Sequence, residues 1–271
     1  MALITKITTQ KDNHERFNVY IDRGKGEEFA FSVDQDVLIK FQLKKGKVID
    51  ELDIQQILYE DDVKKAYNTA LRFLAHRMRS EKEVADYLRK RGILEPVIRE
   101  VFHKLREYNY VNDKEFADAY VRTQKNTTAK GPEVIRQELY DKGISEPLIN
   151  EALEQFTLEE QLATAGKLYE KAKRQNKKFS SQQWKQHIEQ LLRRKGFSWE
   201  IIQQVMSEKG NETDEQEEWE ALEYHGRKAH RRYEKYEGFM YEQKMKQALY
   251  RKGFSMEMIE QFLQRLKEDQ D

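Results

Sequence analysis

The chain has no cysteine among its 271 residues, which excludes disulfide bonds, thiolate metal sites and a cysteine nucleophile. It has only three prolines, and no apolar run approaches the roughly 18 residues that span a membrane. A net charge is lacking as well, because 49 basic residues balance 49 acidic ones. A polycation that coats nucleic acid is therefore excluded, and local patches of charge matter more than their sum.

The first residues also lack the apolar segment of a secretory signal, so we expect a cytoplasmic protein without membrane contact. What the chain has in plenty is Glu, Lys, Gln, Leu and Ala, which favour helix. The predicted fold class is mainly α, with one exception at the amino terminus.

Residues 1–60 form that exception. Residues 16–22 and 28–33 alternate apolar and polar side chains, a strand pattern, and Gly24 and Gly26 lie between them. We predict a small β-meander, with further short strands at 4–8 and 43–48, a helix at 34–41 and a linker helix at 53–60. Gly-Lys-Gly is interpreted as a turn rather than a phosphate loop, because no Gly-Lys-Ser/Thr follows.

A repeat appears when four glycines are aligned. Each follows Leu by four residues and Lys or Arg by one, and intervals of 51, 53 and 57 residues separate Gly92, Gly143, Gly196 and Gly253. Apolar pairs at i, i+1, i+4 and i+5 follow each glycine, which predicts an amphipathic helix. A period of this size indicates tandem supersecondary units.

The helix boundaries have physical causes. A basic residue before each glycine suits the carboxyl end of a helix, and glycine takes the positive φ that follows it. Two capping boxes, Ser80 with Glu83 and Thr157 with Glu160, start other helices. Ser145, Ser198 and Ser255 are predicted to be the N-caps that follow the later glycines.

Each unit therefore holds three helices, and stacked units predict an elongated curved rod. The predicted helices span residues 63–78, 81–91 and 95–107; 114–125, 132–141 and 146–156; 158–175, 182–194 and 199–207; and 214–236, 243–251 and 256–267. The predicted domains are a β-rich segment with its linker helix at 1–60 and repeats at 61–108, 109–156, 157–210 and 211–271.

Catalytic chemistry finds no support in the sequence. His225 and His230 lie five residues apart, which does not place them on one helix face, and His-Glu-x-x-His is absent. Most carboxylates have a Lys or Arg at helical spacing, typical of a solvated face. We expect no metal, no cofactor and no enzyme activity.

Two basic patches favour binding. The first repeat carries the cations Arg72, Arg77, Arg79, Lys82, Arg89, Lys90 and Arg91 against three acids. The third carries Lys167, Lys171, Lys173, Arg174, Lys177 and Lys178 against Glu170. Such patches suit phosphates or an acidic protein groove, and an ordinary solvated helix face remains the alternative.

Three segments together resemble the RecX family, bacterial regulators of the RecA recombinase. They are Arg77-x-x-Ser80-x-x-Glu83-Val84-x-x-Tyr87-Leu88, Tyr110-Val111-Asn112-Asp113-x-x-Phe116-Ala117, and Gly131-Pro132-x-x-Ile135-Arg136-Gln137-Glu138-Leu139-x-x-Lys142-Gly143-Ile144-Ser145. The resemblance covers about residues 62–271, and the β segment with a fourth unit is similar to the longer form found in Firmicutes.

The resemblance implies a regulator that lies in the groove of RecA filaments on DNA and contacts DNA directly or through the filament, and we expect it to be a monomer. It implies reduced ATP hydrolysis, strand exchange and SOS repressor cleavage. The residues expected to make these contacts are Arg77, Arg79, Lys82, Arg89, Lys90, Arg91, Lys130, Arg136 and Lys142. Of these, the family motif covers Arg77, Arg136 and Lys142 best.

Two other classes stay open. A helical-repeat protein that binds DNA without a filament would bind naked DNA tightly with a steep salt dependence, and the zero net charge argues against it. A nuclease with helix-borne carboxylates on Mg²⁺ would cleave DNA, and the lack of a compact acidic motif argues against that.

Overall fold

The computed structural model of the chain describes residues 1–175, 178–209 and 215–268. The chain divides into two compact units. The first contains Met1–Phe116 together with the turn Lys142–Ile144, and the second contains Ala117–Asp141 and Ser145–Asp271.

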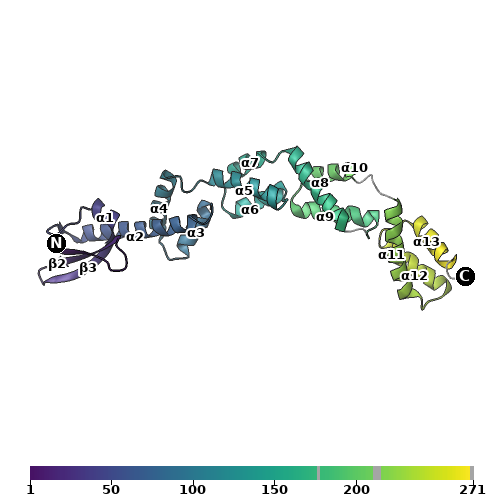
Figure 1. The fold of residues 1–271 in the computed structure, drawn as a ribbon, viewed down its shortest axis with the longest axis horizontal. Helices are drawn as coiled ribbons and strands as arrows, with labels where there is room; N and C mark the ends of the chain where they lie inside the picture. The colour runs from purple at the N-terminus through teal and green to yellow at the C-terminus, as the bar shows by residue number, and fades with distance from the viewer. Residues whose placement is uncertain (176–177, 210–214, 269–271) are drawn as a thin grey trace. The chain divides into compact units, whose positions relative to one another are not determined.

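The amino-terminal domain is a four-stranded antiparallel sheet in the order β3-β2-β1-β4, with one short helix (Figure 1). Its elements are β1 (Ala2–Thr9), β2 (Arg16–Asp22), β3 (Glu27–Asp34), α1 (Gln35–Lys40) and β4 (Val48–Ile49). The predicted meander and its helix are confirmed. The strand predicted at 43–48 is confirmed only at Val48, where β4 begins, because a turn closed by the Lys47 N–H and the Lys44 carbonyl precedes it.

The linker helix and the first repeat helix are one continuous helix, α2 (Glu51–Leu74), so the predicted break between them is wrong. No glycine or proline interrupts that segment, and buried Asp61 anchors its middle to the sheet. Asp61 accepts hydrogen bonds from the Arg16 guanidinium at 2.8 and 3.2 Å and from the Asp34 N–H at 2.8 Å. Burial alone would raise the pKa of Asp61, but these bonds and Lys65 outweigh burial, so the pKa lies below its ordinary value.

The rest of the described chain is helical, as predicted, in tandem three-helix repeats. The helices are α3 (Glu81–Arg89), α4 (Glu95–Glu107), α5 (Asp113–Thr127), α6 (Pro132–Asp141), α7 (Glu146–Glu154), α8 (Leu158–Gln175), α9 (Ser181–Lys195), α10 (Trp199–Lys209), α11 (Glu215–Tyr233), α12 (Gly238–Tyr250) and α13 (Met256–Glu268). The predicted start of α12 at residue 243 is five residues too late, because Tyr241 already continues the apolar spacing of Met245 and Leu249.

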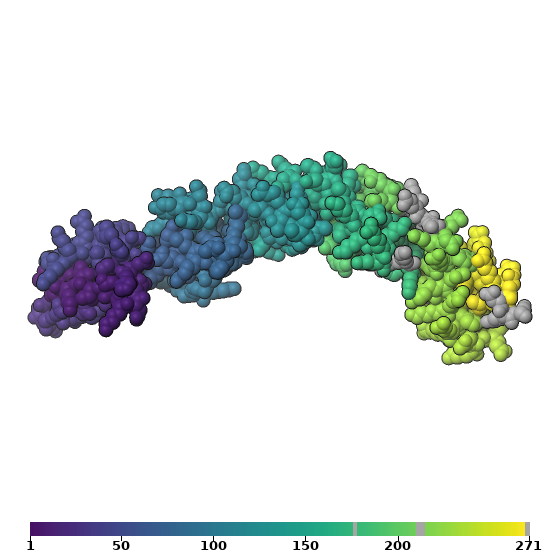
Figure 2. Space-filling view, viewed as in Figure 1, coloured from purple at the N-terminus to yellow at the C-terminus, as the bar shows by residue number. Residues whose placement is uncertain are grey.

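The repeats have cores of their own. In the first repeat α2, α3 and α4 enclose Val84, Leu88 and Val101, and in the last one α11, α12 and α13 enclose Met245 and Phe254. Figure 2 shows that each block of surface carries one stretch of the colour scale, as expected for domains built from contiguous segments. The exact boundaries between repeats stay predictions, and the one at 210–211 lies outside the described residues.

The predicted glycine turns and capping boxes are confirmed. The four glycines have φ between 76° and 89°. Ser80 and Glu83 form a complete capping box, and Thr157 and Glu160 exchange the same pair of hydrogen bonds. Ser145 occupies its N-cap position without a side-chain hydrogen bond, and Pro147 lies in the first turn of that helix.

Candidate interaction surface

The residues of the first motif come together at the amino end of α3. The Arg77 guanidinium donates to both carboxylate oxygens of Glu83, at 2.8 and 3.2 Å, and the Lys142 ammonium donates to one of them at 3.2 Å. The Ser80 hydroxyl donates to the Lys142 backbone carbonyl at 2.8 Å. Arg77, Ser80, Glu83 and Lys142 therefore form one cluster that fixes the turn at Gly143 to the start of α3.

Glu83 is the centre of this cluster. Burial alone would raise its pKa, but hydrogen bonds from Arg77, Lys142 and the Ser80 backbone N–H outweigh burial and lower the pKa to about 2. Its side chain is one-fifth exposed, so the surrounding water screens these charges only in part. Two of the predicted binding cations thus neutralise an acid of the same chain.

Two more of the predicted cations lie on aromatic rings. Phe73 of α2 and Tyr87 of α3 stack with their ring centroids 3.7 Å apart. The Arg79 guanidinium lies 3.6 Å from the Phe73 centroid, and the Arg91 guanidinium lies 3.6 Å from the Tyr87 centroid. The result is a four-layer stack, Arg79–Phe73–Tyr87–Arg91, that ties α2 to α3 and keeps both guanidinium groups near the surface.

The remaining predicted residues are placed as follows. Arg89 pairs with Asp86 and Glu95, Lys130 pairs with Glu138, and Arg136 donates to the Asn150 side chain at 2.6 Å. Lys82 and Lys90 are exposed on the first repeat. The role of the nine residues in binding stays a prediction.

The contact at Ser80 recurs along the chain. The Gly131 N–H at the start of α6 donates to the Lys195 carbonyl at 2.7 Å, and the Ser180 hydroxyl at the start of α9 donates to the Lys252 carbonyl. In every case the first turn of the middle helix of one repeat meets the Lys-Gly turn that ends the middle helix of the next. We call this contact the capped joint.

Sequence reasoning did not assign Ser80, Glu83 or Ser180 to any joint. The sequence carries part of the signal, since Ser80 and Ser180 are serines at the start of a middle helix, but only the structure shows that both are fully buried. A buried hydroxyl needs a hydrogen-bond partner, but the sequence does not show that the partner lies 62 or 72 residues away.

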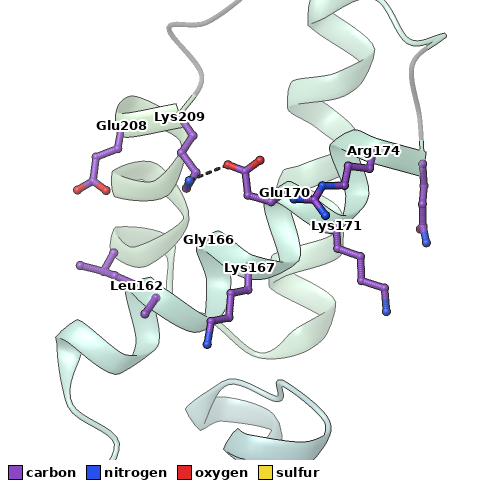
Figure 3. A pocket seen from close by; sticks show the side chains of 10 residues that line it. Leu162, Gly166, Lys167, Glu170, Lys171, Arg174, Glu208 and Lys209 are labelled. Atoms are coloured by element: carbon purple, nitrogen blue, oxygen red, sulfur yellow. Dashed lines mark hydrogen bonds and ion pairs between the residues drawn. The ribbon is translucent and has the colours of Figure 1, made fainter.

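The second basic patch borders a pocket of about 770 Å³ between α8 and α10. Figure 3 shows Glu170 reaching toward Lys209, with which it pairs at 2.7 Å, while Lys167 and Lys171 extend away from that pair. Lys167, Lys171 and Arg174 are exposed and lie at i, i+4 and i+7, on one face of α8. Lys177 of this predicted patch lies outside the described residues.

The histidines do not gather into a metal site. His225 contacts the Lys178 carbonyl at 2.9 Å, and His230 contacts the Tyr241 hydroxyl at 2.7 Å. Within residues 1–175, 178–209 and 215–268, no group of three or more His, Asp or Glu side chains is placed to hold a metal ion. In the same part of the chain, no helix has the length and apolar character needed to cross a bilayer.

These features define a tandem three-helix repeat protein with an amino-terminal sheet. Family models match almost the whole chain: the Regulatory protein RecX N-terminal domain at residues 2–50, the first RecX three-helix domain at 66–105 and the second at 112–153. The third RecX three-helix domain matches twice, at 159–206 and 215–263. The chain belongs to the RecX family of regulatory proteins.

Relatives and solved structures agree. "Regulatory protein RecX" of Geobacillus sp. (strain WCH70) is 61% identical over 99% of this chain and 98% of its own. The protein of that name in Bacillus subtilis (strain 168) is 52% identical over 97% of this chain and 98% of its own. A crystal structure of regulatory protein RecX matches with a TM-score of 0.67 at 37% identity, over 76% of this chain and all of its own. The crystal structure of RecX from Lactobacillus salivarius matches with a TM-score of 0.53 at 39% identity, over 55% of this chain and 97% of its own.

Proposed function

We propose that this protein is a negative modulator of the RecA recombinase. It binds in the groove of RecA–DNA filaments and lowers ATP hydrolysis, strand exchange and the co-protease activity of the SOS response. The observation that carries the proposal is membership of the RecX family over nearly the whole chain. The protein acts by binding rather than by catalysis, and it needs no cofactor.

The repeated architecture supports this mode of action. Each repeat presents helix faces of its own to a partner, so several weak contacts on one chain add up to tight binding through effective concentration. A filament offers the same subunit surface many times, which suits a ligand made of repeated units. A partner that presented its surface only once would gain nothing from the repetition.

The contacting side chains are the exposed cations. Lys82 and Lys90 lie on the first repeat, and Lys167 and Lys171 lie on α8. These exposed cations present their charge to the solvent, whereas Arg77 would have to leave Glu83 before it met a phosphate or a carboxylate. Arg77, Arg136 and Lys142 stay in the proposal as residues that hold the surface in shape and contribute to its charge.

The test is DNA-dependent ATP hydrolysis by preformed filaments of the cognate recombinase, titrated with this protein. We expect the rate of ATP hydrolysis to fall even when there is well below one molecule of this protein per recombinase subunit, because a ligand that spans subunits acts on several at once. The double variant Lys82→Glu, Lys90→Glu should need about tenfold more protein for the same inhibition. Lys44→Glu with Lys45→Glu, the same charge change on an exposed turn of the amino-terminal domain, should leave inhibition intact.

Co-sedimentation with filaments and circular dichroism complete that experiment. Unchanged inhibition by the Lys82, Lys90 variant, with helix content preserved, would remove these residues from the interface. No effect of the wild-type chain at any ratio, together with no co-sedimentation, would refute the recombinase proposal.

A protein that binds DNA without a filament is the second candidate, and the row of Lys167, Lys171 and Arg174 on α8 favours it. Phosphate contacts release counterions, so this function requires affinity for naked DNA that falls steeply with salt. Lys167→Glu with Lys171→Glu should then abolish DNA binding. Filament inhibition that survives in that variant would separate the two functions.

A further inference from the structure

The described residues contain three capped joints. Two further elements, the turn at Gly92 and the amino end of α12, have the form of a joint half but take part in no joint. A methyl group on Gly143, Gly196 or Gly253 would lie 2.7, 2.5 or 2.8 Å from the turn of helix that covers it. A methyl group on Gly92 would meet no atom of the described residues within 4 Å. The first repeat thus has the same Lys/Arg-Gly turn, with the same positive φ, but nothing described covers it.

The amino end of α12 is the matching half. It corresponds to the helix starts that cover the glycine turns, and its N-cap, Glu237, makes no side-chain capping hydrogen bond. Phe239 occupies the position that Lys82 and Gln182 hold in α3 and α9, where those residues lie against Gly143 and Gly253. At α12 this position is 78% exposed.

Both leftover halves carry an apolar side chain at a position that is polar in the other repeats. Leu94 stands two residues after Gly92, where the later repeats have Ser145, Ser198 and Ser255, and it is 71% exposed. Phe239 stands where the other middle helices carry Lys82, Glu133 and Gln182. An exposed Leu and an exposed Phe at the two unused ends of one repeated contact are what a joint between two molecules requires.

Polar groups match as well. In the joint between α6 and α9, the N–H groups of Gly131 and Glu133 donate to the carbonyls of Lys195 and Gly196. The first-turn N–H groups of α12 have no partner within their own helix, and the carbonyls that end α3 are their complement. The two helix dipoles would align head to tail, and Glu237 would approach Lys90 and Arg91.

We propose that the Gly92 turn of one molecule receives the amino-terminal turn of α12 of a second molecule, so that copies of this chain associate head to tail through a fourth capped joint. The backbone N–H groups of Glu237 and Phe239 donate to the carbonyls of Arg91 and Gly92, and Phe239 packs on Leu94. The contact uses two different surfaces, so association does not close into a symmetric dimer. The expected monomer then describes dilute solution only.

Sedimentation velocity of the full chain, from micromolar to near-millimolar concentration and without recombinase or DNA, tests this proposal independently of the proposed function. The mean mass should rise with concentration. Leu94→Lys and Phe239→Lys should each be monomeric alone, because each removes one side of the apolar Phe239–Leu94 contact. A joint between separate molecules needs that contact, whereas the joint that contains Lys82 lies within one chain and benefits from its high effective concentration. Their equimolar mixture should give dimers and no larger species, since each variant retains the half that the other lacks.

Leu52→Lys is the matched control, because Leu52 is an apolar residue that is 74% exposed in the first turn of α2 and belongs to neither half of the joint; it should associate like the wild type. Leu94→Ser and Phe239→Gln restore residues that inner repeats carry, so they should fold normally and still raise the dissociation constant at least about tenfold. A wild-type chain that stays monomeric at every concentration overturns the proposal. So does association that survives in the Leu94 or Phe239 variants, or a mixture that stays monomeric.

Discussion

Glu83 is the residue at which the predicted cations converge, and it makes the cluster sensitive to acid. Its pKa of about 2 lies below the ordinary value of 4.5, so the folded state binds the proton more weakly than the unfolded state does. The stabilisation from Glu83 is therefore fully present above about pH 4.5. It is lost as the pH falls through about 2.

We predict that Glu83→Gln lowers the free energy of unfolding of the first repeat by about 1–3 kcal/mol at pH 7, because Arg77 and Lys142 lose a shared anion. The difference from wild type should shrink as the pH falls from about 4.5 toward 2. Urea unfolding at a series of pH values measures it, with the exposed Glu100→Gln as the control. A difference that does not depend on pH would show that packing, not charge, holds Glu83.

Single residues also show where sequence reasoning ended. Arg77 and Lys142 were selected as motif residues, but the sequence did not reveal their pairing with Glu83, because Lys142 lies 59 residues from Glu83 along the chain. Arg79 and Arg91 were selected for their charge, and they lie on a ring stack that depends on how α2 and α3 pack. Sequence identifies a cation, but its partners depend on tertiary contacts.

At the scale of elements, the glycine turns differ in what surrounds them. Gly92 and Gly196 have nearly the same positive φ, 76° and 89°, so alanine is strained at both. At Gly196, however, the added methyl group would lie 2.5 Å from the backbone nitrogen of Val134, an atom that cannot move aside by rotating a side chain. The two positions thus separate backbone strain from the requirement of the joint.

We predict that Gly92→Ala costs about 1 kcal/mol of stability, from backbone strain alone. Gly196→Ala should cost about 2–4 kcal/mol, because the joint with α6 must open as well. Chemical unfolding monitored by circular dichroism measures both, and each variant is the other's control. Equal losses would mean that the α6–α9 joint contributes little.

Most elements were predictable because local chemistry marks them. The alternation in β2 and β3, the glycine turns and the capping boxes are all encoded within a few residues, and each is confirmed. The sequence did not show that the linker helix continues through Asp61 into α2. Asp61 anchors this part of α2 to the sheet by pairing with Arg16, and the two residues lie 45 positions apart in the sequence. The joints were missed for the same reason.

At the scale of the whole molecule, each repeat depends on its neighbours through the joints. The start of α9 illustrates this dependence, since Ser180 binds the Lys252 carbonyl and Ser181 binds Glu218 of α11. Both contacts join the third repeat to the fourth, its neighbour in the chain. Stability in such an array is close to a sum of intrinsic and nearest-neighbour contributions.

We predict that a chain ending at Lys209, which lacks α11, α12 and α13, still folds but loosens locally at the start of α9. Removing Glu218 and the Lys252 carbonyl leaves Ser180 and Ser181 without these partners, whereas the equivalent cluster of Ser80 and Glu83 keeps all of its own. Amide hydrogen exchange should therefore rise at least about tenfold in the first turns of α9 and stay unchanged in α3, which is the internal control. Faster exchange in α3 as well would mean that stability is shared along the whole chain rather than between neighbours, and the capped joint would then be a consequence of repeat packing rather than its cause.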